Sequence, residues 1–160
     1  LRLAPQDVPT SSSLLVSSFI AYATFSLAQG VIELSVARAM VAAMVDTLLL
    51  GTLSYFLLWA RMHANRWMQT ATALAGSGAI FEAMSLPFLV WQHQLDKQDP
   101  MALVPFLFTL ALLFWFIVVI GHILRHALST GLAVGAVLAT LYMYLSLSVM
   151  SIIFFGVEPA

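Results

Sequence analysis

The chain contains no cysteine. It can therefore form no disulfide bond, no iron–sulfur cluster and no thiolate metal site, and it offers no cysteine nucleophile. Charged side chains are also few, at 8% of 160 residues, against about 25% in soluble domains. Because only six of them are Lys or Arg, the chain lacks the basic stripe that nucleic-acid binding requires. Glycine-rich phosphate loops and dinucleotide fingerprints are absent too, so we expect no nucleic-acid partner and no cofactor.

Apolar residues, in contrast, dominate the composition. They make up 62% of the sequence, and the mean hydropathy is +1.00. This leaves too little polar surface to cover a water-soluble globule, so the composition predicts an integral membrane protein. Five runs reach the ~20 residues that a helix needs to cross ~30 Å of hydrocarbon. We predict spans at residues 14–32, 41–60, 68–91, 101–121 and 129–155.

The shape of these runs and of the links between them predicts the fold. The runs are continuous rather than alternating and too long for barrel strands, which indicates an all-α protein. The links, at residues 33–40, 61–67, 92–100 and 122–128, are all short, so consecutive helices run antiparallel in one up-and-down bundle. We expect a juxtamembrane segment at residues 1–13, a single five-helix transmembrane domain at 14–156 and a short tail at 157–160.

The basic residues predict an orientation. Four lie at the end of the bundle that holds the N-terminus, namely Arg2, Arg61, Arg66 and Arg125, and two lie at the other end, namely Arg38 and Lys97. Since basic residues near span ends favour the cytoplasmic side, we expect the N-terminus inside and the C-terminus outside.

Small residues recur every fourth position in two spans, which places them on one helical face. The third span carries Ala71, Ala75, Ala79 and Ala83, and the fifth carries Ala127, Gly131, Gly135 and Ala139. Such stripes let membrane helices approach closely. We expect them to be helix-packing residues within the bundle, with homodimerisation through the fifth span as the alternative.

Two carboxylates lie inside predicted spans, Asp46 in the second and Glu82 in the third. At 1.5 Å per residue they are ~8 Å and ~14 Å from the same end of the bundle. A charge at mid-membrane costs ~2.5–3.5 kcal/mol, which makes such an acid a candidate functional group. Each shares a helical face with small residues, so we expect both to point into the bundle.

Two interpretations of these carboxylates remain open. In the first, Asp46 and Glu82 form a proton or cation site, where adjacent carboxyls would share one proton. In the second, each is a structural carboxyl that is hydrogen-bonded to a neighbouring helix or paired with Arg38. The side chains available as partners are Thr24, Gln29, Thr47 and Ser85.

A basic cluster is predicted at the other end of the bundle. Its members are Arg61, His63, Arg66, His122, Arg125 and His126. The spacing of His122 and His126 suits zinc, but Ile123 stands where a metalloprotease has its glutamate. We therefore expect no metal and interpret the cluster as an interface for anionic headgroups or an acidic partner. Because every His is predicted at an interface, none can serve a serine within the membrane, and we expect no enzyme.

Three segments carry a resemblance to a known family. They read "NRWMQTATALAGSGAIFEAMSLPFLVW", "FWFIVVIGHILRHALSTG" and "GAVLATLYMYLSLSVMSIIFF". This order of a basic loop, a Gly/Ala-rich span, a span that ends in glycine and a polar turn, and a small-residue span resembles the Ypt-interacting-protein (Yip) family. The resemblance implies five spans with the N-terminus inside. The signatures of eukaryotic members are absent and the size is that of bacterial ones, so it implies the bacterial inner membrane and no catalytic residue.

Two functions fit these observations. The first is a non-enzymatic membrane interaction protein, a scaffold or accessory subunit whose partners are lipid and other membrane proteins or itself. The second is a small ion- or proton-coupled transporter that uses Asp46 and Glu82. Few polar residues recur along any one helical face, which favours the first, since transporters line their pathway with polar groups.

Overall fold

The computed structural model describes residues 5–96 and 99–155. Within them helices are the only regular secondary structure, and there is no strand. The long helices are α1 (Ser12–Glu33), α2 (Val36–Ala60), α3 (Trp67–Gln94), α4 (Leu103–Ala127) and α5 (Leu132–Phe155), and single turns of 3-10 helix are η1 (Pro5–Asp7), η2 (Ala64–Arg66) and η3 (Pro100–Ala102). All five long helices have the length and hydropathy to cross a membrane. The prediction of an all-α fold with five helices long and apolar enough to span a membrane is confirmed. Arg2, Lys97 and the expected tail at 157–160 lie outside the described residues.

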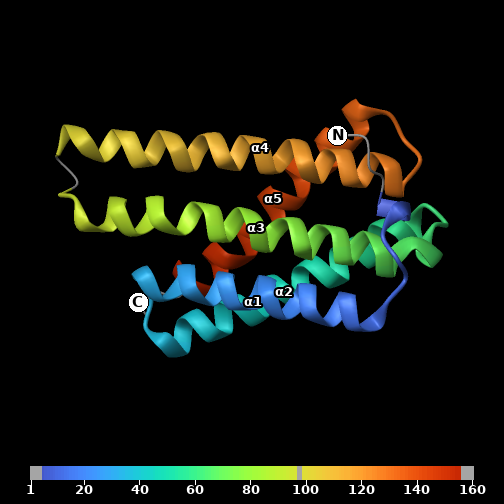
Figure 1. The fold of residues 1–160 in the computed structure, drawn as a ribbon, viewed down its shortest axis with the longest axis horizontal. Coiled ribbons are helices and arrows are strands. Elements are labelled where there is room, and N and C mark those ends of the chain that lie inside the picture. The colour runs from blue at the N-terminus through green and yellow to red at the C-terminus, as the bar shows by residue number, and fades with distance from the viewer. Residues whose placement is uncertain (1–4, 97–98, 156–160) are drawn as a thin grey trace.

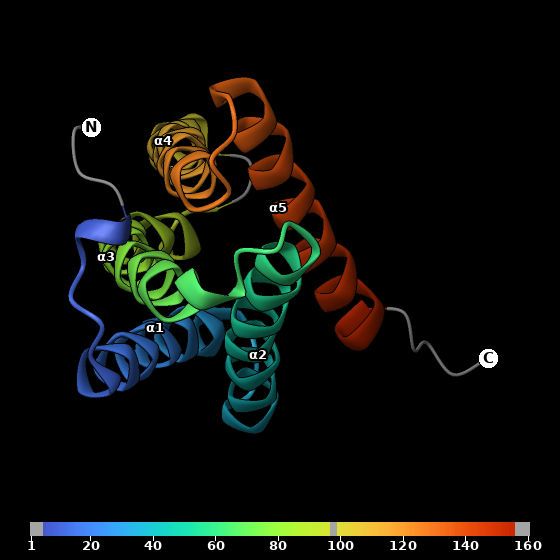
Figure 2. The ribbon, with the colours of Figure 1, turned by 90° about the vertical axis from the view of Figure 1, so that its right-hand side faces the viewer.

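The five helices run alternately in opposite directions (Figure 1). In the packing, α3 lies between α1 and α4, while α2 packs on α1 and α5 packs on α4. Viewed along the bundle, α5 crosses obliquely instead of running parallel to its neighbours (Figure 2). The first turn of α1 and the α2–α3 and α4–α5 turns lie together at what we call the basic end. The α1–α2 and α3–α4 connections lie at the opposite end.

Two helices extend five residues or more beyond their predicted limits. α2 begins at Val36 and not at residue 41, and α4 continues to Ala127 and not to residue 121. The predicted loop at 122–128 is therefore wrong, because residues 122–127 belong to the C-terminal end of α4 and Leu128 is its C-cap. The hydropathy pattern stops at the first polar residues, Arg38 and His122, whereas the helices continue through them. α4 ends only where the amides of Ser129 and Thr130 cap its last carbonyls.

The caps at the basic end are a matched pair. At the end of α2, the amide of His63 donates to the carbonyl of Leu58 (2.7 Å) and that of Met62 to Trp59 (3.0 Å). At the end of α4, Thr130 donates to Arg125 (2.9 Å) and Ser129 to His126 (3.3 Å). These are Schellman motifs, whose turn residue adopts a left-handed conformation that favours glycine. Here the turn residues are Met62 (φ 58°) and Ser129 (φ 54°).

Close packing between α4 and α5 near the basic end depends on two glycines. A Cβ atom on Gly135 would lie 2.3 Å from the carbonyl oxygen of Gly121, so the two backbones touch. One helical turn further, Ala139 is fully buried. Leu58, Ala127 and Leu128 form a buried cluster beside this contact. Gly131, in contrast, precedes α5 in the turn and has open space around it.

The alanine stripe of α3 lies largely inside the bundle. Ala71 and Ala75 are fully buried, Ala79 is 5% exposed, and Ala83 is partly exposed. Ala79 and Ala83 lie beside residues of α1, and α1 and α3 form the most extensive helix contact in the molecule. Small residues thus allow the close approach of the central helix and its neighbour.

Candidate functional site

Asp46 and Glu82 line the same cavity. It has a volume of about 360 Å³, and all five helices contribute to its wall. Nine of the lining residues carry polar side chains: Tyr22, Ser26 and Gln29 on α1, Asp46 on α2, Glu82 and Ser85 on α3, Thr109 on α4, and Tyr142 and Ser146 on α5. The two intramembrane carboxylates therefore face one polar space within the bundle.

Asp46 is held by two hydroxyl groups from two other helices. The Tyr22 hydroxyl on α1 donates to Oδ2 at 2.5 Å, and the Ser146 hydroxyl on α5 donates to Oδ1 at 2.9 Å. The Tyr22 bond is a short one, whereas the Ser146 bond has the ordinary length of a hydroxyl hydrogen bond. Both oxygens of Asp46 act as acceptors, and the carboxylate joins α1, α2 and α5 at one point.

Gly78 makes room for this arrangement. A Cβ atom at this position of α3 would lie 2.7 Å from Cε2 of Tyr22. The Tyr22 ring consequently lies directly on the backbone of α3 and is only 5% exposed. Without a side chain at Gly78, the ring can cross α3 and bring its hydroxyl to Asp46.

Glu82 is bound differently. Its Oε2 atom is buried and accepts no hydrogen bond from any described residue. The Gln29 amide instead donates to the backbone carbonyl of Glu82 (3.0 Å) and to Ser85 Oγ (2.8 Å). Gln29 therefore ties α1 to α3 but leaves this carboxylate oxygen unbound. A buried acceptor without a partner costs about 1–3 kcal/mol, so it indicates a site that a bound group would complete.

The cavity is closed toward the basic end. Phe116 and Tyr142 separate it from a layer in which Leu50, Leu74 and Ile120 leave a space of only about 10 Å³. All three are buried core residues. On another side the cavity wall includes Leu113 of α4 and Leu147 of α5, which are 37% and 63% exposed. The cavity therefore reaches the surface between α4 and α5 and ends at a tightly packed layer inside.

The sequence did not indicate which side chains hold Asp46. The hydroxyls of Thr24 and Thr47, two expected partners, donate to carbonyls of their own helices, at 2.7 and 2.6 Å. Arg38, the expected ion-pair partner, is exposed. The actual donors are Tyr22 and Ser146. The sequence did contain a clue to the role of Tyr22. Tyrosine favours membrane interfaces, yet Tyr22 lies in the middle of a span.

The predicted basic cluster divides into several parts. Arg61 is exposed, and its carbonyl is hydrogen-bonded to the His63 ring. Arg66 donates to the carbonyl of Ala127 (3.2 Å) and to Ser129 Oγ (2.9 Å), which links the start of α3 to the α4–α5 turn.

The remaining members of the basic cluster lie on α4. His122 is buried and only 8% exposed, so its ring is turned into the protein and not toward headgroups. It stacks edge-on against His126 with ring centroids 4.6 Å apart. Arg125 is partly buried. Among the described residues, no three His, Cys, Asp or Glu side chains gather as a metal site would require.

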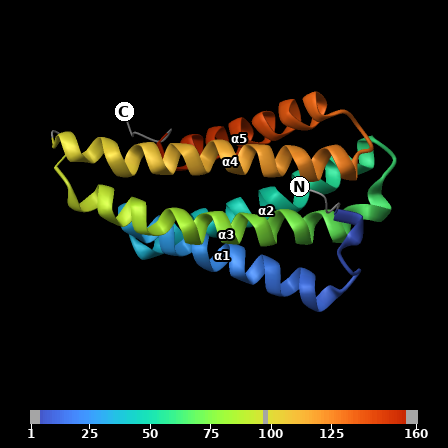
Figure 3. The same cartoon turned by 45° about the horizontal axis from the view of Figure 1, so that its top comes forward.

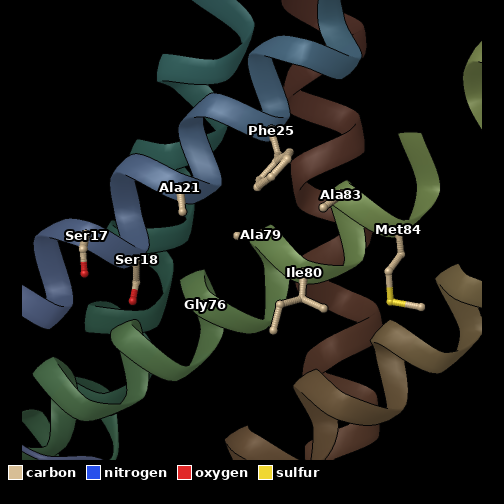
Figure 4. A pocket seen from close by; sticks show the side chains of 9 residues that line it. All are labelled: Ser17, Ser18, Ala21, Phe25, Gly76, Ala79, Ile80, Ala83 and Met84. Carbon is tan, nitrogen blue, oxygen red and sulfur yellow. The ribbon is translucent and has the colours of Figure 1, made fainter. Parts of the chain in front are cut away.

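A second hollow lies on the surface between α1 and α3 (Figure 4). Its volume is about 540 Å³, and its wall consists mostly of small residues. The lining residues are Ser17, Ser18, Ala21 and Phe25 on α1 and Gly76, Ala79, Ile80, Ala83 and Met84 on α3. None of them titrates, so this groove offers packing surface and no acid–base chemistry.

Comparison with protein-family models, with curated proteins and with solved structures finds no match to this chain. No family is identified, so the functional argument starts from the geometry of the cavity.

Proposed function

We propose that the protein is a small cation transporter, coupled to protons or ions, whose binding groups are Asp46 and Glu82. The observation that carries this proposal is the shared cavity, in which two intramembrane carboxylates meet and one buried oxygen of Glu82 has no partner within the described chain. A proton or a cation is the kind of group that would complete it.

The energetics of the two acids support this assignment. A charge at mid-membrane costs about 2.5–3.5 kcal/mol. For Asp46 the hydroxyls of Tyr22 and Ser146 offset that cost. Glu82 has no comparable donors at Oε2, so its cost is met only when a proton or a cation is bound. Transport also requires an exit, and the leucine-rich layer beneath Phe116 and Tyr142 is the barrier that has to open.

Flux measurements in liposomes test the proposal. Wild-type protein is reconstituted with an internal pH dye, and gradients of protons, Na⁺ and K⁺ are applied in turn. We expect a flux in the wild type and its loss in Glu82→Gln. Glu33→Gln is the matched control, because Glu33 is an exposed carboxylate at the end of α1. A wild type that conducts none of the three ions would contradict the proposal.

The orientation and membrane belong to the same proposal. Arg61, Arg66 and Arg125 lie at the basic end and Arg38 at the opposite end. We propose that the basic end faces the cytoplasm, which places the N-terminus inside and the C-terminus outside, in a bacterial inner membrane. Membership of the Yip family remains a proposal based on sequence pattern.

The surface groove favours a second candidate function, that of an accessory subunit or scaffold. A strip of serine, glycine and alanine between α1 and α3 suits the close approach of a helix from another membrane protein. Gentle extraction from native membranes followed by mass spectrometry tests it. Co-purification of a stoichiometric partner that is lost in Ala83→Leu would support this candidate, and a protein that extracts only with lipid would contradict it.

A further inference from the structure

We propose that the cavity between the five helices binds a small organic ammonium ion, an amine that carries an apolar body. This inference rests on the proposed cation site at Asp46 and Glu82 and specifies the class of cation.

The size of the cavity favours an organic ligand over a bare ion. Its volume of about 360 Å³ lies within the roughly 300–1,000 Å³ of small-molecule pockets. A water molecule occupies only about 30 Å³, so a single inorganic ion would leave most of the space unfilled.

The polar groups match an ammonium ion. An ammonium group carries three N–H donors and no acceptor, so it needs acceptors that are not already engaged. Glu82 Oε2 is buried without a donor, and Asp46 supplies negative charge in the same cavity. A Ca²⁺ ion is poorly served, because it takes six to eight oxygen ligands and each oxygen of Asp46 already accepts one hydroxyl bond.

The remaining wall suits an apolar body next to a cation. Phe81 and Phe116 form an aromatic pair with ring centroids 5.0 Å apart, and both line the cavity together with the Tyr22 ring. Aromatic faces attract ammonium groups through cation–π contacts. Met143 and Met150 complete the wall, and their flexible side chains adapt to irregular apolar ligands.

Calorimetric titration of the purified full-length chain in nanodiscs tests this inference. The probe is 2-phenylethylammonium chloride, and 2-phenylethanol is the control ligand of similar shape without the charge. We expect saturable binding of the amine, no saturable binding of the alcohol, and no competition from Na⁺. Equal binding of amine and alcohol would overturn the inference, because it would show apolar partition without recognition of the ammonium group. This comparison uses wild-type protein and so does not depend on the folding of a variant.

A variant series locates the site. Glu82→Gln is expected to weaken amine binding at least tenfold, while Glu33→Gln leaves it unchanged. An unchanged affinity in Glu82→Gln would place the amine elsewhere and overturn the inference. Flux assays separate the two proposals. Ion flux without amine binding contradicts the organic ligand alone, and amine binding without flux of protons, Na⁺ or K⁺ contradicts transport alone.

Discussion

The two halves of the bundle differ in how closely their helices pack. Near the basic end, α4 and α5 touch backbone to backbone at Gly121 and Gly135, and the space beneath Phe116 and Tyr142 is only about 10 Å³. Toward the opposite end, the same helices leave a cavity of about 360 Å³ lined by two carboxylates. Helices in lipid associate through close contact and hydrogen bonds, since lipid is as apolar as leucine. Both halves use both kinds of contact, since Arg66 also donates hydrogen bonds at the basic end and Gly78 also packs closely on Tyr22 in the cavity half. The difference lies in the backbone contact of α4 and α5 near the basic end and in the polar cavity toward the opposite end.

Gly135→Ala is expected to lower the unfolding free energy more than any other substitution considered for the two halves. The new Cβ would lie 2.3 Å from the Gly121 carbonyl oxygen and 2.9 Å from Arg125 Cβ, and backbone atoms cannot rotate away. We expect a loss of about 3 kcal/mol or more in unfolding free energy, measured by denaturation in mixed detergent. Gly131→Ala is the matched control, because nothing lies within 4 Å of its new Cβ. Equal losses of unfolding free energy at both positions would mean that this contact does not stabilise the basic half.

Gly78→Ala tests whether packing supports the chemistry of the cavity half. Its Cβ would lie 2.7 Å from the Tyr22 ring, so the ring must move and pull its hydroxyl from Asp46. We expect a cost of about 1–2 kcal/mol. In a Tyr22→Leu background the same substitution should cost much less, and a double-mutant cycle measures the difference. Additive costs would show that Gly78 acts independently of Tyr22.

The two hydroxyl donors to Asp46 predict a smaller effect. Removing Tyr22 Oη by Tyr22→Phe, or Ser146 Oγ by Ser146→Ala, should cost about 0.6–1.7 kcal/mol each, as measured for hydrogen bonds between membrane helices. We expect a larger cost for Tyr22→Phe, since its bond is shorter, at 2.5 Å against 2.9 Å. Thr52→Val is the control, because the Thr52 hydroxyl bonds only within α2. A cost at Thr52 as large as at Tyr22 would argue against a special role for the Asp46 contacts.

The smallest expected effect is a gain in stability rather than a loss. Met62→Gly and Ser129→Gly relieve left-handed backbone conformations at the two Schellman caps. Each should stabilise the basic half by roughly 0.5–1 kcal/mol, read as a higher midpoint of thermal unfolding. Arg61→Gly, next to Met62 but at a negative φ of −101°, should bring no gain. A lower midpoint for Met62→Gly would show that its side chain contributes more than the conformation costs.

The sequence predicted the fold better than the cavity. Runs of apolar residues determine how many helices cross a membrane, so five spans followed directly, while helix ends were misplaced at Arg38 and His122. The two acids were predicted to face inward, because small residues shared their helical faces. Their surroundings could not be predicted, since Tyr22 and Ser146 stand 24 and 100 residues from Asp46. Each helix contributes only a few polar groups, and the polar surface forms only when five helices assemble.

The lengths of α1 and α3 place unequal demands on the surrounding lipid. At 1.5 Å per residue, the 22 residues of α1 cover about 33 Å and the 28 residues of α3 about 42 Å, against a hydrocarbon layer of about 30 Å. α3 and α4 accordingly project beyond the α1–α2 turn (Figure 3). Bilayers respond to such hydrophobic mismatch by helix tilt or local thickening. Because Glu82 lies near the middle of α3, a tilt of this helix moves its carboxyl relative to Asp46. The thickness of the membrane therefore bears directly on the shape of the cavity.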